Sequence, residues 1–148
     1  MFIAGVKKIP EECIGVDNII FCSFMDKNNP DDYQKYINLN KKCHLFLLPT
    51  KAEAAGVVFC EAAAFGIPCY TYATGGTTSY VINDYNGRAL PEHSQPSDFA
   101  NAIISDICNN KLVQYNKNAL TLSSERLSWE AWGRRISDII ESEIRIMS

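Results

Sequence analysis

Residues 44–76, which read HLFLLPT, KAEAAGVVFCEAAAFGIP and CYTYATGG, decide the fold of this chain. They predict a buried strand from His44, a loop that carries Glu53, a short helix that carries Glu61, and a second strand over 68–72. A strand that leads through a loop into a helix is where α/β proteins bind ligands, because the carboxyl end of the strand and the free N–H groups of the helix face the same crevice. We therefore expect an α/β fold with a ligand site in this loop.

The two glutamates have different predicted positions. The helix should begin near Gly56, which places Glu53 in the loop ahead of it and Glu61 in its second turn. Apolar residues surround Glu61 at helical spacing, and we expect this stripe to pack on the sheet: Val57, Val58 and Phe65.

A carboxylate in such surroundings needs a partner, since burying an unpaired charge is costly. The hydroxyl groups of a sugar or ribose suit this role, because a carboxylate can accept hydrogen bonds from two of them at once. The N–H groups of Gly56, Val57 and Val58, at the start of the helix, form a candidate phosphate site.

A further set of residues at characteristic spacing makes the pattern specific: Pro49, Thr50, Glu53, Gly56, Glu61, Ala62, Gly66, Pro68, Gly75, Gly76, Asp84, Asn86 and Gly87. With these residues the chain resembles the donor-binding domain of retaining glycosyltransferases of family four, which have the two-domain GT-B fold. The resemblance is densest over residues 43–91. It implies that residues 1–148 are a Rossmann-like parallel sheet with flanking helices, one half of a GT-B fold.

The resemblance also implies roles for individual residues. Glu53 would contact the donor sugar near the reacting centre, and Glu61 would hold the ribose hydroxyls of the nucleotide. The remaining donor contacts would come from a set of largely backbone groups: Ala55, Gly56, Val57, Val58, Gly75 and Gly76. The family often has an aromatic residue where this chain has Ala55. The implied donor is a UDP- or GDP-linked sugar, and no metal is required.

Composition is that of an ordinary soluble domain. Charged residues make up 21% of the chain, apolar ones 47%, and the net charge is -3, which gives no electrostatic reason to expect nucleic acid. The six cysteines form no C-x-x-C pair and no zinc spacing, so we expect reduced thiols and a cytosolic location. No apolar run approaches the roughly 18 residues of a membrane helix.

The rest of the chain predicts further β-α-β units. Strands are expected over 2–5, 19–22 and 88–90, and a helix should follow an Asn29 cap and Pro30. Another helix should start at Pro96 with Ser97 as its cap. The last helix should begin near Ser128 and carry an apolar stripe that either packs on the sheet or, as the resemblance implies, crosses to a partner domain: Trp129, Trp132, Ile136, Ile139 and Ile140.

The resemblance further implies that the first strand of the domain and the preceding acceptor-binding domain lie outside this chain. That strand would lie between the strands at Phe2 and His44, so we expect these two to pair with each other, to be completed by another chain, or to leave the piece unstable. The chain alone should have little or no transferase activity, and membrane association would come only through the absent part.

Two other functions remain open from the sequence. One is a different reaction on the same architecture, such as nucleotide-sugar epimerisation. The other is a non-catalytic module, a truncated copy that binds a partner or nothing.

Overall fold

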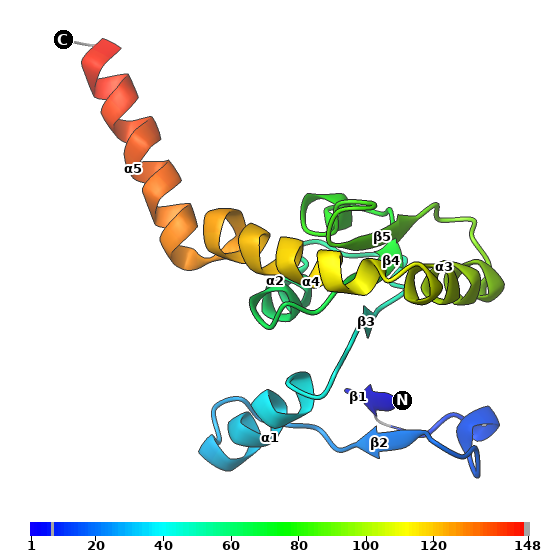
Figure 1. Cartoon of the computed structure of the whole chain (residues 1–148). Coiled ribbons are helices and arrows are strands. Elements are labelled where there is room, and N and C mark those ends of the chain that lie inside the picture. The colour runs from blue at the N-terminus through cyan, green and yellow to red at the C-terminus, as the bar shows by residue number, and fades with distance from the viewer. Residues whose placement is uncertain (7, 147–148) are drawn as a thin grey trace. The chain divides into compact units, whose positions relative to one another are not determined.

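The computed structural model describes residues 1–6 and 8–146. They form two compact units, Met1–Lys42 and Cys43–Ser148, shown in Figure 1 from blue to cyan and from cyan to red. All the strand pairs within them are parallel, as predicted for an α/β fold.

The first unit is one β-α arrangement. Strands β1 (Phe2–Ala4) and β2 (Ile20–Cys22) pair in parallel with Phe2 opposite Ile20, and a short 3₁₀ turn, η1 (Glu11–Cys13), lies between them in sequence. Helix α1 (Pro30–Asn40) begins as expected, because the side chain of Asn29 accepts hydrogen bonds from the N–H groups of Asp31 and Asp32.

The first unit has little core of its own. None of its described residues is buried, and Phe24 is 80% exposed. A two-stranded parallel sheet with one helix has too few layers to enclose its apolar side chains, since parallel sheets are normally covered on both faces.

The second unit is built on a three-stranded sheet of order β3-β4-β5: β3 (Phe46–Leu47), β4 (Cys69–Tyr72) and β5 (Gly87–Leu90). Its helical segments are α2 (Val57–Ala64), η2 (Thr77–Ser79), α3 (Pro96–Cys108), α4 (Lys111–Leu122), η3 (Ser123–Leu127) and α5 (Trp129–Ile146). Within the described residues β1 pairs with β2 and β3 with β4, in separate sheets. One of the three alternatives from the sequence, pairing of the strands at Phe2 and His44 with each other, is thus found in neither sheet.

The central strand β4 divides the core of the second unit into two clusters. Cys69 packs with Phe59 of α2, and the ring of Phe59 meets that of Phe46 edge-on at 5.9 Å between centroids. Tyr70 and Tyr72 pack on the other side with Phe99 of α3. Alternate residues of a strand point to opposite faces, so the four residues of β4 hold helices on both sides of the sheet.

The turn before β5 is held by Asn86, which is 1% exposed. Its side chain accepts from the N–H of Ile82 at 2.8 Å and donates to the carbonyl oxygen of Tyr80 at 2.9 Å. Gly87 has a φ of +153°, and a Cβ there would collide with the carbonyl oxygen of Cys69. Both residues are structural.

One predicted cap is wrong. Helix α3 begins at Pro96, but its cap is Gln95 rather than Ser97: the N–H of Gln95 donates to Oδ2 of Asp98 at 2.7 Å. The aspartate three residues into the helix reaches back to the cap, as in a capping box.

A polar network joins β5, α3 and α4. The carboxylate of Asp106, 0% exposed, accepts from Arg88 Nε at 2.8 Å, Arg88 Nη2 at 2.6 Å and the Tyr70 hydroxyl at 3.0 Å. Burial works to raise the pKa of Asp106, but the hydrogen bonds from Arg88 and Tyr70 outweigh it and lower that pKa. Asp84 completes the network, with Arg88 at 2.7 Å and Lys111 at 3.0 Å, and the Lys111 hydrogen bond lowers the pKa of Asp84.

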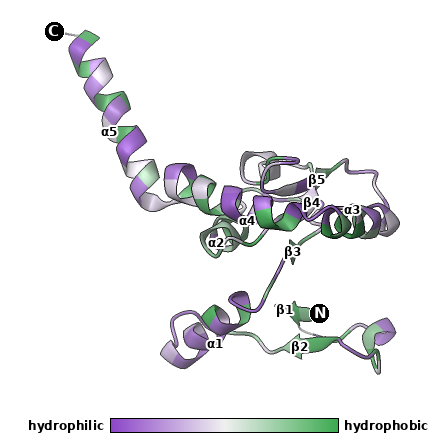
Figure 2. Cartoon of the chain, viewed as in Figure 1, coloured by the Kyte–Doolittle hydropathy of each residue, from purple (hydrophilic) through white to green (hydrophobic). Residues whose placement is uncertain are grey.

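The apolar stripe of α5 is exposed. Figure 2 shows hydrophobic residues recurring along this helix, and Trp129, Trp132, Ile139 and Ile140 are each more than half exposed. The expectation that the stripe packs on the sheet is therefore wrong. Helix α5 contacts η3 instead, and Ala131 near its start is buried. Over the described residues, no helix combines the length and apolarity needed to cross a bilayer.

Candidate functional site

The predicted site begins with Glu53 at the start of α2. The N–H of Gly56 donates to Oε1 of Glu53 at 3.0 Å, and the side chain of Glu53 is half-buried. Gly56, the N-cap of α2, has a φ of +56°, a conformation that favours glycine. A carboxylate here also faces the positive end of the helix dipole, which stabilises its charge.

The pairing of Glu53 with Gly56 changes one expectation. The sequence predicts that all three N–H groups of Gly56, Val57 and Val58 are open to phosphate, but that of Gly56 is already occupied by the carboxylate of Glu53. Val57 and Val58 are the first two residues of α2, where an N–H has no acceptor within the helix. Their N–H groups are the candidates that remain for binding an anion.

The Gly75-Gly76 turn lies against the loop of Glu53, although it is more than twenty residues away in sequence. The N–H of Gly76 donates to the carbonyl oxygen of Glu53 at 3.4 Å. A Cβ on Gly75 would collide with this same oxygen, and one on Gly76 would lie 3.1 Å from the carbonyl oxygen of Ala54. The two glycines are thus required by the close approach of two backbones at the site.

Side-chain hydroxyls hold this turn in place. The hydroxyl of Thr77 accepts from the N–H of Thr74 at 3.1 Å and donates to the carbonyl oxygen of Tyr72 at 2.7 Å. The hydroxyl of Thr74 in turn donates to the carbonyl oxygen of Lys51 at 3.3 Å, in the loop before Glu53. These hydrogen bonds therefore connect the end of β4 to the loop after β3, next to Glu53.

Glu61 lies on a different face of α2 from the one that packs. The buried side of the helix consists of Phe59, Ala62 and Ala63. Val57 is 59% exposed and Val58 38% exposed, so the expectation that they pack on the sheet is wrong. Residues three or four apart share a helix face, and Glu61 therefore lies with Val57 and Val58 on the flank that is not buried. This places the second glutamate on the same flank as the N–H groups of Val57 and Val58.

A cavity of about 450 Å³ adjoins this flank. Ala55, Val57 and Cys60 line one side of it, and Tyr80 lines another. The ring of Tyr80 covers Gly56, where a Cβ would lie 2.7 Å from its Cδ2 atom. The remaining wall comes from the end of η3 and the start of α5: Arg126, Leu127, Ser128, Trp129, Trp132 and Arg135.

Sequence reasoning does not assign this wall to the site. From the sequence, Trp129 and Trp132 are predicted only to be part of an apolar stripe. Nothing in the sequence around Tyr80 indicates a binding role, apart from its position four residues after Gly76. Helical spacing shows which residues share a face, but not which distant loop that face meets.

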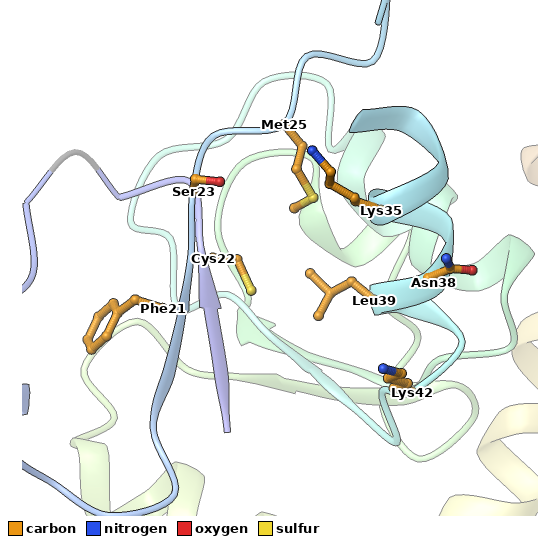
Figure 3. Close-up of a pocket in the computed structure, with 8 residues that line it drawn as sticks. All are labelled: Phe21, Cys22, Ser23, Met25, Lys35, Asn38, Leu39 and Lys42. Carbon is orange, nitrogen blue, oxygen red and sulfur yellow. The ribbon is translucent and has the colours of Figure 1, made fainter. Parts of the chain in front are cut away.

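A second cavity, of about 390 Å³, lies within the first unit between β2 and α1. Figure 3 shows Cys22 and Leu39 pointing toward each other across it, with Lys35 on α1 and Lys42 just after the end of that helix. Lys35 is paired with Asp32 at 2.8 Å. None of the site residues predicted from the sequence lines this cavity.

The described part of the chain contains no cluster of three or more His, Cys, Asp or Glu side chains placed to hold a metal ion.

Two curated proteins are similar in sequence to most of this chain. A D-inositol 3-phosphate glycosyltransferase of Corynebacterium kroppenstedtii is 29% identical over 134 residues, which are 89% of this chain and 28% of the relative. A glycosyltransferase of Methanocaldococcus jannaschii is 27% identical over 124 residues, 84% of this chain and 34% of the relative. The chain thus spans about a third of the length of these relatives.

Solved structures show the same fold. HepE from Anabaena in complex with UDP superimposes with a TM-score of 0.68 at 24% identity, over 85% of this chain and 33% of HepE. Sucrose-phosphate synthase from Thermosynechococcus elongatus gives a TM-score of 0.68 at 22% identity, over 88% of this chain and 31% of the synthase. The α/β architecture predicted from the sequence, that of the C-terminal half of a GT-B glycosyltransferase, is confirmed.

The sequence profile described as "Glycosyl transferases group 1" matches residues 3–121, which include both glutamates and the double-glycine turn. The chain belongs to the group 1 glycosyl transferase family.

Proposed function

We propose that this chain is the donor-binding part of a retaining glycosyltransferase of family four. In this proposal Glu53 contacts the transferred sugar, Glu61 binds the ribose of the nucleotide, and the N–H groups of Val57 and Val58 contact the diphosphate. The observation that carries it is the position of Glu53: its carboxylate is held at the start of α2 by the N–H of Gly56, and the turn at Gly75 packs against its backbone.

The donor is a nucleoside diphosphate sugar, and a UDP-linked sugar is the first to test. HepE, which shares the fold, has been crystallised with UDP and with UDP-glucose. The start of α2 suits a diphosphate, because free N–H groups and the helix dipole favour negative charge there. No metal is required in this proposal, since these N–H groups, with basic residues from outside this chain, would stabilise the leaving group.

The reaction transfers the sugar from diphosphate to an acceptor hydroxyl. The bond from the anomeric carbon to the diphosphate oxygen breaks, and the diphosphate leaves with the electron pair. The acceptor oxygen forms a new bond to the same carbon on the same face, and its proton passes to the departing diphosphate. Glu53 would favour the positive charge that develops on the sugar, and catalysis would rest on positioning and electrostatics.

The whole enzyme would contain a second domain that binds the acceptor, and it would act in the cytoplasm. The exposed stripe of α5 is a surface suited to contact with such a domain. Membrane association would come only through that further part. The chain by itself would show little or no turnover, which a sugar-transfer assay beside the two-domain enzyme would test.

Calorimetric titration of the chain with UDP and GDP tests donor binding. We expect Glu61→Gln to weaken nucleotide binding by roughly tenfold to a hundredfold, because charge-assisted hydrogen bonds contribute about 1.5–3 kcal/mol. Glu53→Gln should leave it nearly unchanged, since glutamine can still accept from the N–H of Gly56. No binding at millimolar nucleotide would contradict the proposal.

Turnover in the enzyme that includes the acceptor-binding domain tests the role of Glu53. Glu53→Gln should lower turnover far more than it weakens nucleotide binding. Equal losses in both would count against a role at the reacting centre.

A further inference from the structure

The apolar stripe of α5 runs along the whole helix. Its large side chains are between 37% and 81% exposed: Trp129, Trp132, Ile136, Ile139, Ile140, Ile144 and Ile146. Ala131, which is buried, lies about two and a half turns before Ile140 and therefore on the opposite side of the helix. The side of α5 that packs on its own unit is thus not the side that carries the stripe. An exposed apolar surface of this extent is typical of an interaction site.

The stripe has the spacing of a helix that pairs with another helix. Steps of three and four residues alternate along it, which are the a and d positions of a heptad repeat: Trp129, Trp132, Ile136, Ile139, Glu143 and Ile146. All of these except Glu143 are apolar. In a pair of such helices the a and d side chains of each helix insert between those of the other and form a common seam.

Glu143 determines the direction of the second helix. Over the described residues Glu143 forms no ion pair, whereas Glu141 is paired with Arg145 at 3.9 Å. In a parallel pair of identical helices, Glu143 would face Glu143 of the second copy within the seam, and the two like charges would repel each other. In an antiparallel pair centred on the middle of α5, Glu143 instead faces Trp132 of the second copy, within reach of Arg135 beside the seam.

The guanidinium of Arg135 is suited to this contact. Its Nη2 donates to the carbonyl oxygen of Arg126 at 3.0 Å, and over the described residues it forms no ion pair with a carboxylate. An ion pair between Arg135 and Glu143 of a second copy would therefore neutralise two charges that lack an ionic partner within one chain.

The same antiparallel register also matches the apolar side chains. It places Ile136 opposite Ile139 of the second copy, and Trp129 opposite Ile146. Each contact occurs twice, because two identical surfaces meet around a twofold axis. Charge and apolar surface thus favour one arrangement.

We infer that two copies of this chain associate through antiparallel α5 helices, with Glu143 of each copy paired with Arg135 of the other. Helix α5 has 18 residues and is about 27 Å long, so the contact is small and we expect a dissociation constant on the order of 10 µM. The stripe is also the surface proposed above for contact with an acceptor-binding domain, so one α5 helix binds one of these two partners at a time.

Sedimentation equilibrium over a range of chain concentrations tests the association. The mass should rise from that of one chain to that of two. Tryptophan emission should shift to shorter wavelength over the same range, because the chain has two tryptophans, Trp129 and Trp132, and both become buried in the pair. A mass of one chain up to about 300 µM would overturn the inference and leave the stripe to the acceptor-binding domain. Assembly beyond two copies would also overturn it.

Reversal of the charge at Glu143 tests the seam. Glu143→Arg should weaken association about tenfold or more, because the new guanidinium would lie beside Arg135 of the second copy. Glu141→Arg is the matched control: Glu141 lies about two and a half turns after Trp132, hence on the side of α5 away from the seam. Its association should stay within about twofold of the wild type. An equal loss in the control would overturn the assignment.

Exchange of the two charges tests the antiparallel direction. Arg135→Glu should weaken association as Glu143→Arg does, and the chain with both changes should recover to within about threefold of the wild type. The two residues are eight positions apart on one helix, or about 12 Å, so this recovery has to come from contact between copies. Circular dichroism should be unchanged in every variant, which shows that they are folded. A double variant that associates no better than either single variant would overturn the antiparallel pairing.

Discussion

Gly56→Ala should destabilise the second unit by about 2–5 kcal/mol. The φ of Gly56 is +56°, and an alanine in the left-handed conformation costs about 1–2 kcal/mol. The new methyl would lie 2.7 and 2.8 Å from two atoms of the Tyr80 ring and 3.2 Å from Phe59, and overpacking of this kind costs about 1–3 kcal/mol more.

Urea unfolding followed by tryptophan emission measures this loss, since both tryptophans belong to the second unit. Gly133→Ala is the control. Gly133 lies within α5, and a Cβ there would meet no other side chain within 4 Å, so this change should stabilise the chain by up to about 1 kcal/mol. The two substitutions add the same methyl group and should shift the free energy of unfolding in opposite directions.

A double-mutant cycle separates the two causes of the loss. In a Tyr80→Ala background the methyl no longer meets the ring, so Gly56→Ala should there cost mainly the backbone term of about 1–2 kcal/mol, with the 3.2 Å approach to Phe59 as the remaining contact. A loss below about 1 kcal/mol in the wild-type background would refute the reasoning. An identical loss in both backgrounds would show that Tyr80 does not cover Gly56.

Three further changes test the interior of the second unit. Asp106→Ala should lower the free energy of unfolding, measured with urea, by about 3 kcal/mol, because the Arg88 guanidinium and the Tyr70 hydroxyl lose this partner. A loss under about 1 kcal/mol would contradict the network. Acid should lower the free energy of unfolding progressively below about pH 4, because folding lowers the pKa values of Asp84 and Asp106. Their contribution to stability is complete above the unfolded pKa of about 3.9 and is lost as the pH falls. A free energy of unfolding that stays constant down to about pH 2 would oppose this. Thr71→Val should be neutral or stabilising by up to about 1 kcal/mol in the same assay, since the hydroxyl of Thr71 is buried and has no hydrogen-bond partner among the described residues; a loss above about 1 kcal/mol would show that it has one.

Local signals predicted most of the elements. Asn29 and Pro30 start α1, Gly56 starts α2, and Gly66 follows its end with a φ of +69°. These signals succeed because a cap or a left-handed residue acts on N–H and carbonyl groups only a few positions away. The same locality explains why the glutamates could be placed, one before the helix and one in its second turn.

Faces and neighbours were harder to predict. The stripe of Val57 and Val58, predicted to pack, is exposed, whereas Phe59 is fully buried on the other side of α2. Both sets are apolar, so periodicity alone could not choose between them. The choice depends on where β4 and α4 lie relative to the helix, and only long-range packing decides this.

The sequence by itself determined the order and type of the elements, the membership of the family and the two glutamates with their double-glycine partner. Only the tertiary structure decided that the turn at Gly75 packs against the backbone of Glu53, and that Trp129 and Arg135 line the cavity beside the start of α2. The reason is physical: hydrogen bonds within a turn depend on neighbouring residues, whereas the approach of loops roughly twenty or seventy residues apart depends on how the strands and helices between them pack.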